Sequence, residues 1–429
     1  AAKHILSSTD RTIGVQGDAG TGKTFMLRGA VAVAEEKGFD VLGLAPSSKA
    51  TEALSDAAPH VMTLQRFLVM HDAADPPDLS NTVVIVDEAS MVSTRQMKAL
   101  VELANAAGAA RLALVGDVKQ FDAVEAGTPF DQLQKAGMGT AVMSENRRQR
   151  GGDQLDAVNA VAAREVGKAF EKVRSSIIET PPQDRAAVAA GAWLARSEFG
   201  RSRTAIVAQT HSMRREITAH LRDSLKAEGV IGDRSEVINT LVSARLTQAQ
   251  MRSADAFQAG QTVIFNAGNE DLGIPRGGSR TVIDTDTEKG IVSLSDGKSV
   301  TDWSPSEGTG RGCEVFQSKQ LEIAEGDQVR WTRNDADKRF LNAETAAVDQ
   351  IGRNMITFEN AEGERFKVAR NDPALRHMDH GWTHTLHAMQ GQTVDHIIAV
   401  MDASNPQMTT EKAFYVALSR ARDGVTIVT

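Results

Sequence analysis

The sequence contains little cysteine, few aromatic residues and no long apolar run. Cys313 is the single cysteine, which excludes an internal disulfide framework and fits a reducing compartment. No apolar stretch approaches the roughly 20 residues that a membrane-spanning helix needs. The first residues, AAKHILSSTDRT, lack the apolar core of a secretory signal peptide. We therefore expect a cytoplasmic protein that does not insert into a membrane.

Tyrosine is scarce, and positive charge is not in excess. Aromatic residues make up 4% of the chain, and Tyr415 is the single tyrosine. An enzyme that nicks DNA with a tyrosine nucleophile would have to use this residue. The net charge of −8 argues against an extended basic surface that coats duplex DNA. It leaves room for a narrow groove in which a few amides, hydroxyls and basic side chains meet one strand.

The chain of 429 residues exceeds what one hydrophobic core supports, so we expect roughly two to four domains. Its first part alternates short β-branched runs with helical patterns, which is typical of a parallel sheet covered on both faces. The strands expected there are Thr12–Gln16, Val41–Leu44, Thr82–Val86 and Leu112–Val115, and the helices are Lys23–Lys37 and Thr94–Ala106. Similar patterns recur later, with strands at Thr204–Gln209, Asp395–Met401 and Val425–Val428 and a helix at Ser212–Glu228.

Residues 255–378 have a different composition, rich in Gly, Asp, Thr and Ser. Turn signals recur about every 8 to 15 residues, a spacing typical of small antiparallel barrels. The short strands expected here are Gln261–Phe265, Arg280–Asp284, Gly290–Leu294, Gln328–Thr332 and Met355–Phe358. We interpret this segment as one or two β-rich inserts in a second α/β domain.

The stretch from Gly17 to Thr24 matches the phosphate-loop pattern G-x-x-x-x-G-K-[ST] in full. Glycines let the backbone wrap a phosphate, and the following helix N-terminus adds a positive cradle. Lys23 can neutralise the β and γ oxygens, and Thr24 can offer its hydroxyl to Mg²⁺. A chance match is the alternative, but this one follows a strand and opens a helix. The residues expected to bind the nucleotide are Gly17, Ala19, Gly20, Thr21, Gly22, Lys23 and Thr24.

Two carboxylates, Asp87 and Glu88, follow the apolar run Val83–Val86. A buried strand that ends in carboxylates places them at the carboxyl edge of a parallel sheet, where ligands bind. Asp87 would hold Mg²⁺, and Glu88 would polarise the attacking water. An acidic helix N-cap is the alternative interpretation. Beside a complete phosphate loop, the catalytic interpretation is favoured.

Further polar segments follow later in the chain. The apolar run Ala113–Val115 ends in a polar turn, in which Gln120 could contact the γ-phosphate, although a plain surface turn explains these residues almost as well. The remaining segments are a basic cluster at Glu145–Arg150, the stretch Thr383–Gly391 with its HAMQG sequence, and Phe414–Arg422 with its YVALSRAR sequence.

The ordered set GDAGTGKT, APSSKA, TLQRFL, VDEAS, GDVKQ, RRQ, HAMQG and YVALSRAR resembles the RecD-like, 5′-to-3′ branch of the superfamily 1 helicases. More narrowly, it is similar to the helicase part of MobF-type conjugative relaxase–helicases. The motifs run from Gly17 to Arg422, so the resemblance covers nearly the whole chain. It implies two RecA-like parallel-sheet motor domains with SH3-like β-barrel inserts in the second. It also implies ATP and Mg²⁺ as cofactors, with single-stranded DNA and strand junctions as partners, alongside a conjugative relaxosome and its coupling proteins.

The same resemblance implies a domain division and site residues. Residues 1–145 would form the first motor domain, with a short 1B segment near 69–81, and 146–254 with 379–429 the second, leaving 255–378 as the 2B insert. Arg148 and Arg420 match the two arginines that reach the γ-phosphate, and Arg147 is a rival for Arg148. Gln390 and Gly391 match the motif that links nucleotide to DNA. The positions that match strand-contacting residues are Ser47, Ser48, Lys49, Thr63 and His387.

The sequence departs from these helicases in two respects, and other functions are also open to it. The chain begins too near the phosphate loop for the glutamine that reads adenine in relatives, so we expect a fragment of a longer protein. The segment between Thr63 and Val83, where relatives place a strand-splitting pin, is short. The alternatives are a decayed nucleotide-gated DNA-binding module, a small-molecule kinase, and a RecD-type subunit of a recombination nuclease. Intact Lys23, Asp87 and Glu88 argue against decay, and Arg420's motif against a kinase.

Overall fold

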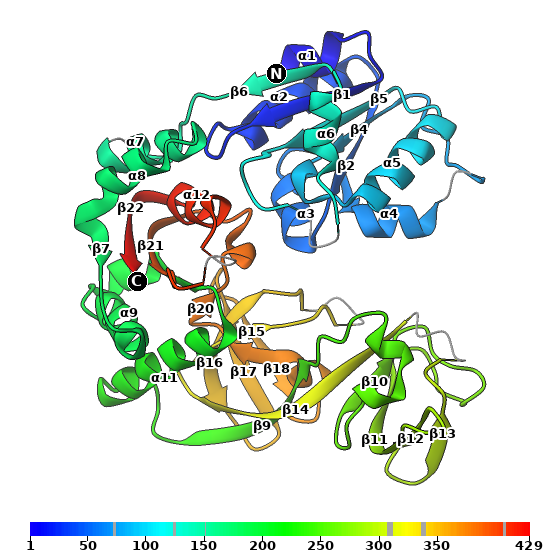
Figure 1. The fold of residues 1–429 in the computed structure, drawn as a ribbon, viewed down its shortest axis with the longest axis vertical. Coiled ribbons are helices and arrows are strands. Elements are labelled where there is room, and N and C mark those ends of the chain that lie inside the picture. Colours follow the sequence, from blue (N-terminus) through cyan, green and yellow to red (C-terminus); the bar gives the residue numbers. More distant parts are fainter. Residues whose placement is uncertain (72–73, 123–125, 151, 307–311, 336–339, 406–408) are drawn as a thin grey trace. The chain divides into compact units, whose positions relative to one another are not determined.

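The computed structural model describes residues 1–71, 74–122, 126–150, 152–306, 312–335, 340–405 and 409–429. It divides into two compact units (Figure 1). The parallel-sheet unit comprises Ala1–Ser224 with Trp382–Thr429, and the antiparallel unit comprises Leu225–Gly381. Within the described residues, no helix has the length and apolar character needed to cross a membrane. Residues 72–73, within the expected 1B segment near 69–81, lie outside this description.

The first parallel sheet has the strand order β3-β2-β4-β5-β1-β6 (Figure 1). Each pairing in it is parallel, so the carboxyl ends of its strands share one edge. Its strands are β1 Thr12–Gly17, β2 Asp40–Ala45, β3 His60–Thr63, β4 Thr82–Val86, β5 Arg111–Gly116 and β6 Thr140–Met143.

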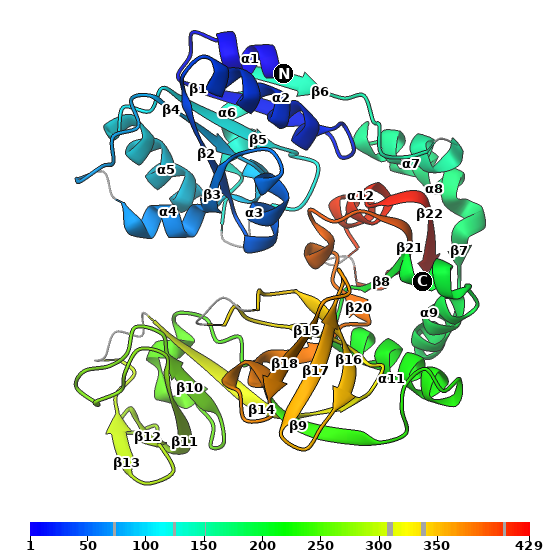
Figure 2. The same cartoon turned by 180° about the vertical axis from the view of Figure 1, so that it is seen from behind.

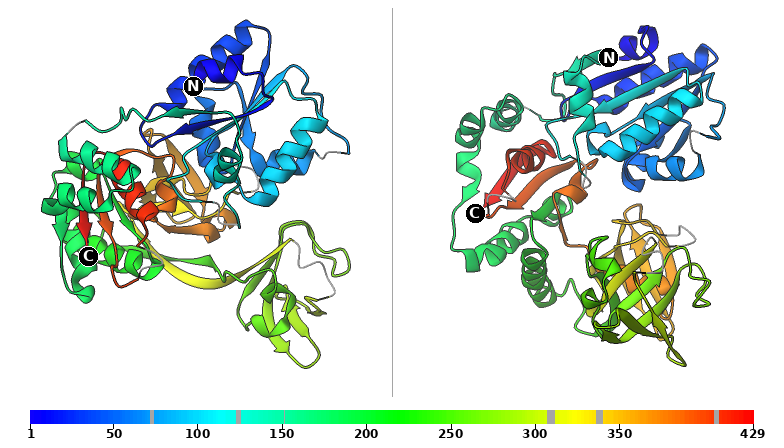
Figure 3. Two further views of the ribbon diagram at one scale, coloured as in Figure 1. Left: turned by 45° about the horizontal axis from the view of Figure 1, so that its top comes forward. Right: turned by 45° about the vertical axis from the view of Figure 1, so that its right-hand side comes forward.

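Alternate residues of these strands enter two different cores, because successive side chains of a strand point to opposite faces. In β4, Val84 and Val86 pack with one group of helices, whereas Val83 and Ile85 pack with another. The first group is α4 Leu64–Met70, α5 Thr94–Ala106 and α6 Pro129–Lys135, and the second is α1 Ala2–Ser7, α2 Lys23–Glu36 and α3 Ser48–Ser55. Both faces of the sheet are therefore covered, as Figure 3 shows.

The second parallel sheet has the order β20-β8-β21-β22-β7. Ile397 and Ala399 of β21 pack with α7, α8 and α12, whereas Ile398 and Val400 pack with α9 and α11 (Figure 2). The strands are β7 Ile177–Ile178, β8 Thr204–Ala208, β20 Thr383–His384, β21 Val394–Val400 and β22 Ala421–Val428. The helices are α7 Gly152–Ala162, α8 Val166–Val173, α9 Arg185–Leu194, α10 Glu198–Ser202, α11 His211–Ala227 and α12 Glu411–Ser419.

The antiparallel unit contains two sheets, ordered β13-β12-β11-β10-β14-β9 and β18-β17-β16-β15-β19. The long strand β14 serves both cores, since Val315 packs in one and Leu321 in the other. The first sheet consists of β9 Ser235–Ser243, β10 Thr262–Phe265, β11 Gly278–Asp286, β12 Ile291–Ser295, β13 Val300–Trp303 and β14 Cys313–Ala324. The second consists of β15 Gln328–Trp331, β16 Thr345–Ile351, β17 Met355–Asn360, β18 Arg365–Ala369 and β19 Met378–His380.

The expected fold class of two parallel α/β sheets with a β-rich segment is confirmed. All the strands and helices that the sequence predicts are present, with ends that differ by a few residues. Among the described residues, no strand pairing closes either antiparallel sheet, so the expected barrel form is not confirmed. The antiparallel unit also includes β9, which precedes residue 255.

Candidate nucleotide-binding site

The loop from Gly17 to Thr24 connects the end of β1 to the start of α2. Gly20 and Gly22 have φ angles of 79° and 81°, a region that favours glycine. At Gly20 a side chain would also lack space, because a Cβ atom there would lie 2.6 Å from Oδ1 of Asn146 and 2.7 Å from Cβ of Arg148. Backbone conformation therefore favours glycine at both Gly20 and Gly22, and close packing excludes a side chain at Gly20 as well.

The Lys23 ammonium folds back over this loop and donates a hydrogen bond of 2.6 Å to the carbonyl oxygen of Gly17. The loop residues line a pocket together with side chains from distant parts of the chain. Its lining comprises Ala19, Gly20, Thr21, Gly22, Lys23, Thr24, Ala50, Ala53, Asp87, Glu88, Gln120, Arg148, Gly391 and Arg420. All of these residues belong to the parallel-sheet unit. The structure thus brings most of the predicted nucleotide and catalytic residues together.

The two carboxylates follow β4 at the shared carboxyl edge of the first sheet. Glu88 has a φ angle of 51°, uncommon for a residue with a side chain, and strained backbone of this kind gathers at functional sites. Burial and the neighbouring Glu88 carboxyl raise the pKa of Asp87 to about 6. The hydroxyl of Thr24 and the Asp87 carboxylate are hard oxygen donors beside a phosphate cradle, so this donor set fits Mg²⁺.

Several polar atoms around the pocket are buried without a hydrogen-bond partner among the described residues. They are Oε2 of Glu88, Nε of Arg420, and both Oε1 and Nε2 of Gln390. Buried polar groups are normally paired with protein, water or ligand, and leaving one unpaired is unfavourable. A ligand with charged oxygens and bound water would satisfy such a set. Gln390 does not itself line the pocket, although its neighbour Gly391 does.

The structure distinguishes the two rival arginines. Arg147 is exposed and forms a surface ion pair of 2.9 Å with Glu145. Arg148 lines the pocket and donates a hydrogen bond of 2.9 Å to the carbonyl oxygen of Ser419. Burial, together with Arg420, lowers the pKa of Arg148 to about 10. This geometry favours Arg148 over Arg147 as the residue that faces a nucleotide.

The predicted strand-contacting residues lie in three places outside this pocket. Ser47 is the N-cap of α3, where its side chain accepts from the amide of Ala50, and Ser48 and Lys49 follow in the first turn. Thr63 is the N-cap of α4. Since Ala45 of β2 pairs with Thr63 of β3, these two helix N-termini share one sheet edge.

His387 lies apart from these helix N-termini, in the short 3₁₀ turn His387–Met389. Its ring stacks on Phe121, with 3.9 Å between ring centroids and 13° between planes. Partial burial lowers the pKa of this histidine.

Sequence reasoning missed residues that flank the motifs. Phe121 and Asp122 follow Gln120, and Asp122 forms an ion pair of 2.6 Å with Lys412. Asn146 lies within the basic cluster but was assigned no role, and its Oδ1 accepts a hydrogen bond of 3.0 Å from the backbone amide of Arg148. No pattern singles these residues out, but Phe121 and Asn146 directly adjoin motif residues and Asp122 is one residue further on, and that proximity is the signal that could have found them.

Two family descriptions match parts of the chain. Residues 1–178 match an AAA domain, and residues 333–429 match the viral superfamily 1 RNA helicase core domain. The multifunctional conjugation protein TraI of Escherichia coli (strain K12) is 24% identical over 487 residues, an alignment that covers 100% of this chain and 27% of TraI. RecD, a subunit of the RecBCD enzyme of Mycolicibacterium smegmatis, is 24% identical over 468 residues, with 100% of this chain and 70% of RecD covered.

The fold is similar to that of Pif1 helicase from Bacteroides in a crystal structure with ADP-AlF3 and single-stranded DNA. The TM-score is 0.55 at 15% identity, and the match covers 99% of this chain and 90% of that one. The chain spans about a quarter of the length of TraI, at 27%. The resemblance to the RecD-like superfamily 1 helicases is confirmed, and the chain is related over its full length to the conjugation protein TraI.

Proposed function

We propose that this helicase couples ATP hydrolysis to 5′-to-3′ movement along single-stranded DNA and unwinds plasmid DNA for conjugative transfer. The observation that carries the proposal is that Lys23, Glu88 and Arg420 all line the same pocket. A phosphate cradle, a carboxylate and an arginine that converge in this way are the parts that phosphoryl transfer from a nucleotide requires. Glu88 and Arg420 each have a buried atom with no hydrogen-bond partner in the part of the chain that the structure describes, which supports a ligand in that pocket.

The proposed roles of the pocket residues in ATP hydrolysis follow from where negative charge lies on the phosphates and develops during the reaction. The loop amides and Lys23 would bind the phosphates, while Thr24 and Asp87 would hold Mg²⁺ when it is bound with the nucleotide. That ion would neutralise charge on the phosphate oxygens. Glu88 would accept a proton from the attacking water. Arg148 and Arg420 would stabilise the charge that develops on the transferred phosphoryl group, with Gln120 beside Arg420.

The DNA partner is proposed from the relatives and from the predicted contact residues. Pif1 binds single-stranded DNA in the structure described above. In this chain, the helix N-termini at Ser47 and Thr63 and the ring of His387 would meet such a strand. TraI is a conjugation protein. This relationship supports the proposal that the chain works in the cytoplasm with a conjugative relaxosome and its coupling proteins. The domain division is proposed as the sequence predicts it, with 1–145 and 146–254 plus 379–429 as motor domains and 255–378 as an SH3-like 2B insert.

A RecD-type recombination helicase is the second candidate. The alignment covers a larger share of RecD, 70%, than of TraI, 27%. Both functions use the same motor and differ in the DNA that enters it.

ATP hydrolysis stimulated by single-stranded DNA tests the proposed motor. The wild-type chain should hydrolyse ATP faster when an oligothymidylate is added, and Lys23→Ala should not hydrolyse it with or without DNA. A wild-type chain that binds the oligonucleotide but never hydrolyses ATP would instead favour a decayed binding module.

A further inference from the structure

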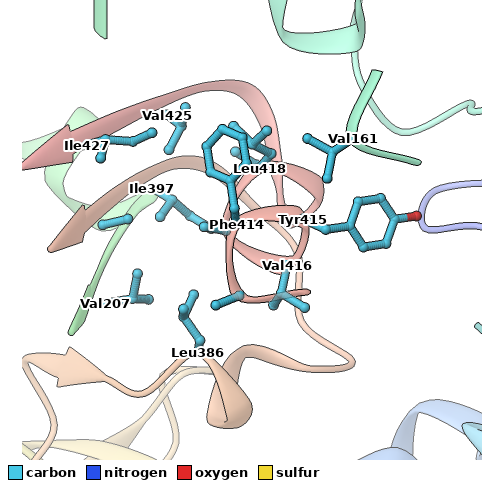
Figure 4. Close-up of a cluster of buried hydrophobic side chains, with 14 of the residues drawn as sticks. Val161, Val207, Leu386, Ile397, Phe414, Tyr415, Val416, Leu418, Val425 and Ile427 are labelled. Atoms are coloured by element: carbon cyan, nitrogen blue, oxygen red, sulfur yellow. The ribbon is translucent and has the colours of Figure 1, made fainter. Parts of the chain in front are cut away.

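Tyr415, the single tyrosine of the sequence, lies on α12 among buried hydrophobic residues. It is 1% exposed. Figure 4 shows its ring extending out of that cluster, with the hydroxyl oxygen directed at a loop coloured as the first part of the chain. This loop is the phosphate loop, because the backbone amide of Ala19 donates a hydrogen bond of 2.9 Å to the Tyr415 hydroxyl.

The Tyr415 hydroxyl makes a second hydrogen bond, of 3.2 Å, to Oδ2 of Asp117. An ionised carboxylate can only accept and a backbone amide can only donate, so the hydroxyl accepts from Ala19 and donates to Asp117. Asp117 is fully buried, at 0% exposed. Removal of the hydroxyl would therefore leave one buried amide without an acceptor and take a donor from one buried carboxylate.

The same carboxylate is linked to Arg420. The side-chain amide of Gln120 donates 2.9 Å to Oδ2 of Asp117, and Nη2 of Arg420 donates to Oε1 of Gln120. Tyr415 on α12 and Arg420 at its C-cap thus contact the Asp117–Gln120 turn at both of its ends. The hydrogen bonds therefore form a closed ring from α12 through the Asp117–Gln120 turn after β5 and back to α12.

The other pocket arginine is also attached to α12. Arg148 donates 2.9 Å to the carbonyl oxygen of Ser419, and Gln149 donates 3.1 Å to the same oxygen. Gln154 donates 2.7 Å to the carbonyl oxygen of Leu418. The last carbonyls of a helix have no partner within it, so these side chains satisfy them. The placement of α12 against the phosphate loop consequently sets the positions of both Arg148 and Arg420.

We propose that Tyr415 is a positioning residue for ATP hydrolysis: its hydroxyl fixes α12 against the phosphate loop and so presents Arg420 and Arg148 to the γ-phosphate. The inference rests on the proposed ATP hydrolysis and extends it to a residue outside the lining of the nucleotide pocket. The simpler alternative is that Tyr415 only fills the hydrophobic cluster, in which case its ring matters and its hydroxyl does not.

The hydroxyl contact should be insensitive to pH in the working range. Burial, and then the neighbouring Asp117, raise the pKa of Tyr415 far above its ordinary value. The hydroxyl therefore keeps the proton that it donates. The effect of its removal should be the same across roughly pH 6 to 9, unlike the effect of removing a titrating base.

The test compares Tyr415→Phe with wild type in steady-state ATP hydrolysis with saturating oligothymidylate. We expect kcat to fall about 10- to 100-fold at every pH, with KM for ATP changed by less than about threefold, because the contact acts on the transition-state arginines. Asp117→Leu removes the acceptor of the same contact, and the double variant should lose much less than the product of the two single effects. Phe414→Leu is the matched control, since Phe414 adjoins Tyr415 and stacks on Phe170 at 4.5 Å without a polar contact.

Phe414→Leu should lower Tm and keep kcat. The inference would be overturned if kcat of Tyr415→Phe stayed within about twofold of wild type. It would also be overturned if kcat fell as much in Phe414→Leu as in Tyr415→Phe. If Tyr415→Phe does not fold, Asp117→Leu decides by the same criteria. A wild-type chain without ATPase activity would contradict the proposed function instead, so the two failures are distinguishable.

Discussion

Arg420 donates a hydrogen bond from Nη2 to Oε1 of Gln120, a residue 300 positions earlier in the chain. Both side chains are buried, Arg420 at 3% and Gln120 at 1% exposed. The Nε atom of the same guanidinium has no partner among the described residues. A guanidinium that is held on one side and unsatisfied on another is suited to an incoming anion.

Arg420→Ala should lower kcat for ATP hydrolysis far more than it raises KM. The reason is that an arginine of this kind stabilises charge that develops mainly in the transition state. Steady-state kinetics over a range of ATP concentrations measures both constants. Arg147→Ala is the matched control, because Arg147 forms an exposed ion pair with Glu145 and should leave both constants unchanged. An unchanged kcat in Arg420→Ala would show that Arg420 has a structural role and takes no part in hydrolysis.

Lys23→Ala and Glu88→Gln should fail at different steps. Loss of the Lys23 ammonium removes the charge that binds phosphate, so ATP binding and hydrolysis should both be lost. Glu88→Gln should bind ATP but turn over about 10²- to 10⁴-fold more slowly, the usual cost of removing a general base. Fluorescent-nucleotide binding and phosphate release separate the two outcomes. Full activity in either variant would refute the assignment of the site.

The sequence predicts elements with strong patterns and misses those without one. The buried run Thr82–Val86 indicates β4 because every residue in it is apolar or β-branched. By contrast, β9 is mostly polar and half-exposed, and it becomes a strand because it pairs with β14 along its whole length. Pairing with a distant strand leaves no local signal.

The candidate site divides in the same way. A local motif identifies Lys23, Glu88 and Arg420, and the structure gathers all three in one pocket. The contacts of Tyr415 could not be predicted, since Ala19 lies 396 residues away and no sequence periodicity relates positions at that distance. Contacts of this kind depend on how the two sheets pack, which a local pattern does not encode.

The antiparallel unit should lose stability in mild acid through His377. Burial, and then Arg333, lower the pKa of this histidine to about 4, and its Nδ1 has no partner among the described residues. The unfolded chain has an ordinary histidine pKa near 6.5. Between these two values the unfolded chain binds a proton that the folded chain does not, so stability falls as pH drops from about 6.5 toward 4.

His377→Phe should remove this acid sensitivity while keeping a ring beside Phe316. Thermal unfolding followed by tryptophan fluorescence at about pH 7.5 and pH 5 measures it. Between these two pH values, the Tm of the variant should fall less than the Tm of wild type. Burial also lowers the pKa of His396 in the other unit to about 4, so part of the acid sensitivity is common to both proteins. The Tm of the variant is therefore compared with the Tm of wild type at each pH. Equal losses in both proteins would contradict the prediction.

Binding to single-stranded DNA should depend only modestly on salt. A chain with a net charge of −8 and a narrow groove would make roughly three to five phosphate contacts. Each contact contributes about −0.7 to the log–log slope on single strands, so a slope of about −2 to −4 is expected. Fluorescence anisotropy with a labelled oligothymidylate measures it, and Lys49→Ala should reduce the slope by about 0.7. A slope near −10 would require an extended basic surface.

The proposed activity of this chain is ATP-driven movement along one DNA strand in the 5′-to-3′ direction. Duplexes of the same sequence with a single-stranded tail at either the 5′ or the 3′ end test it, with strand separation followed by a fluorophore–quencher pair. Lys23→Ala serves as the control without ATP hydrolysis. The account predicts ATP-dependent unwinding of the 5′-tailed duplex by wild type, and no unwinding of the 3′-tailed duplex. Unwinding of the 3′-tailed duplex in preference, or of neither duplex by a chain that hydrolyses ATP, would contradict it.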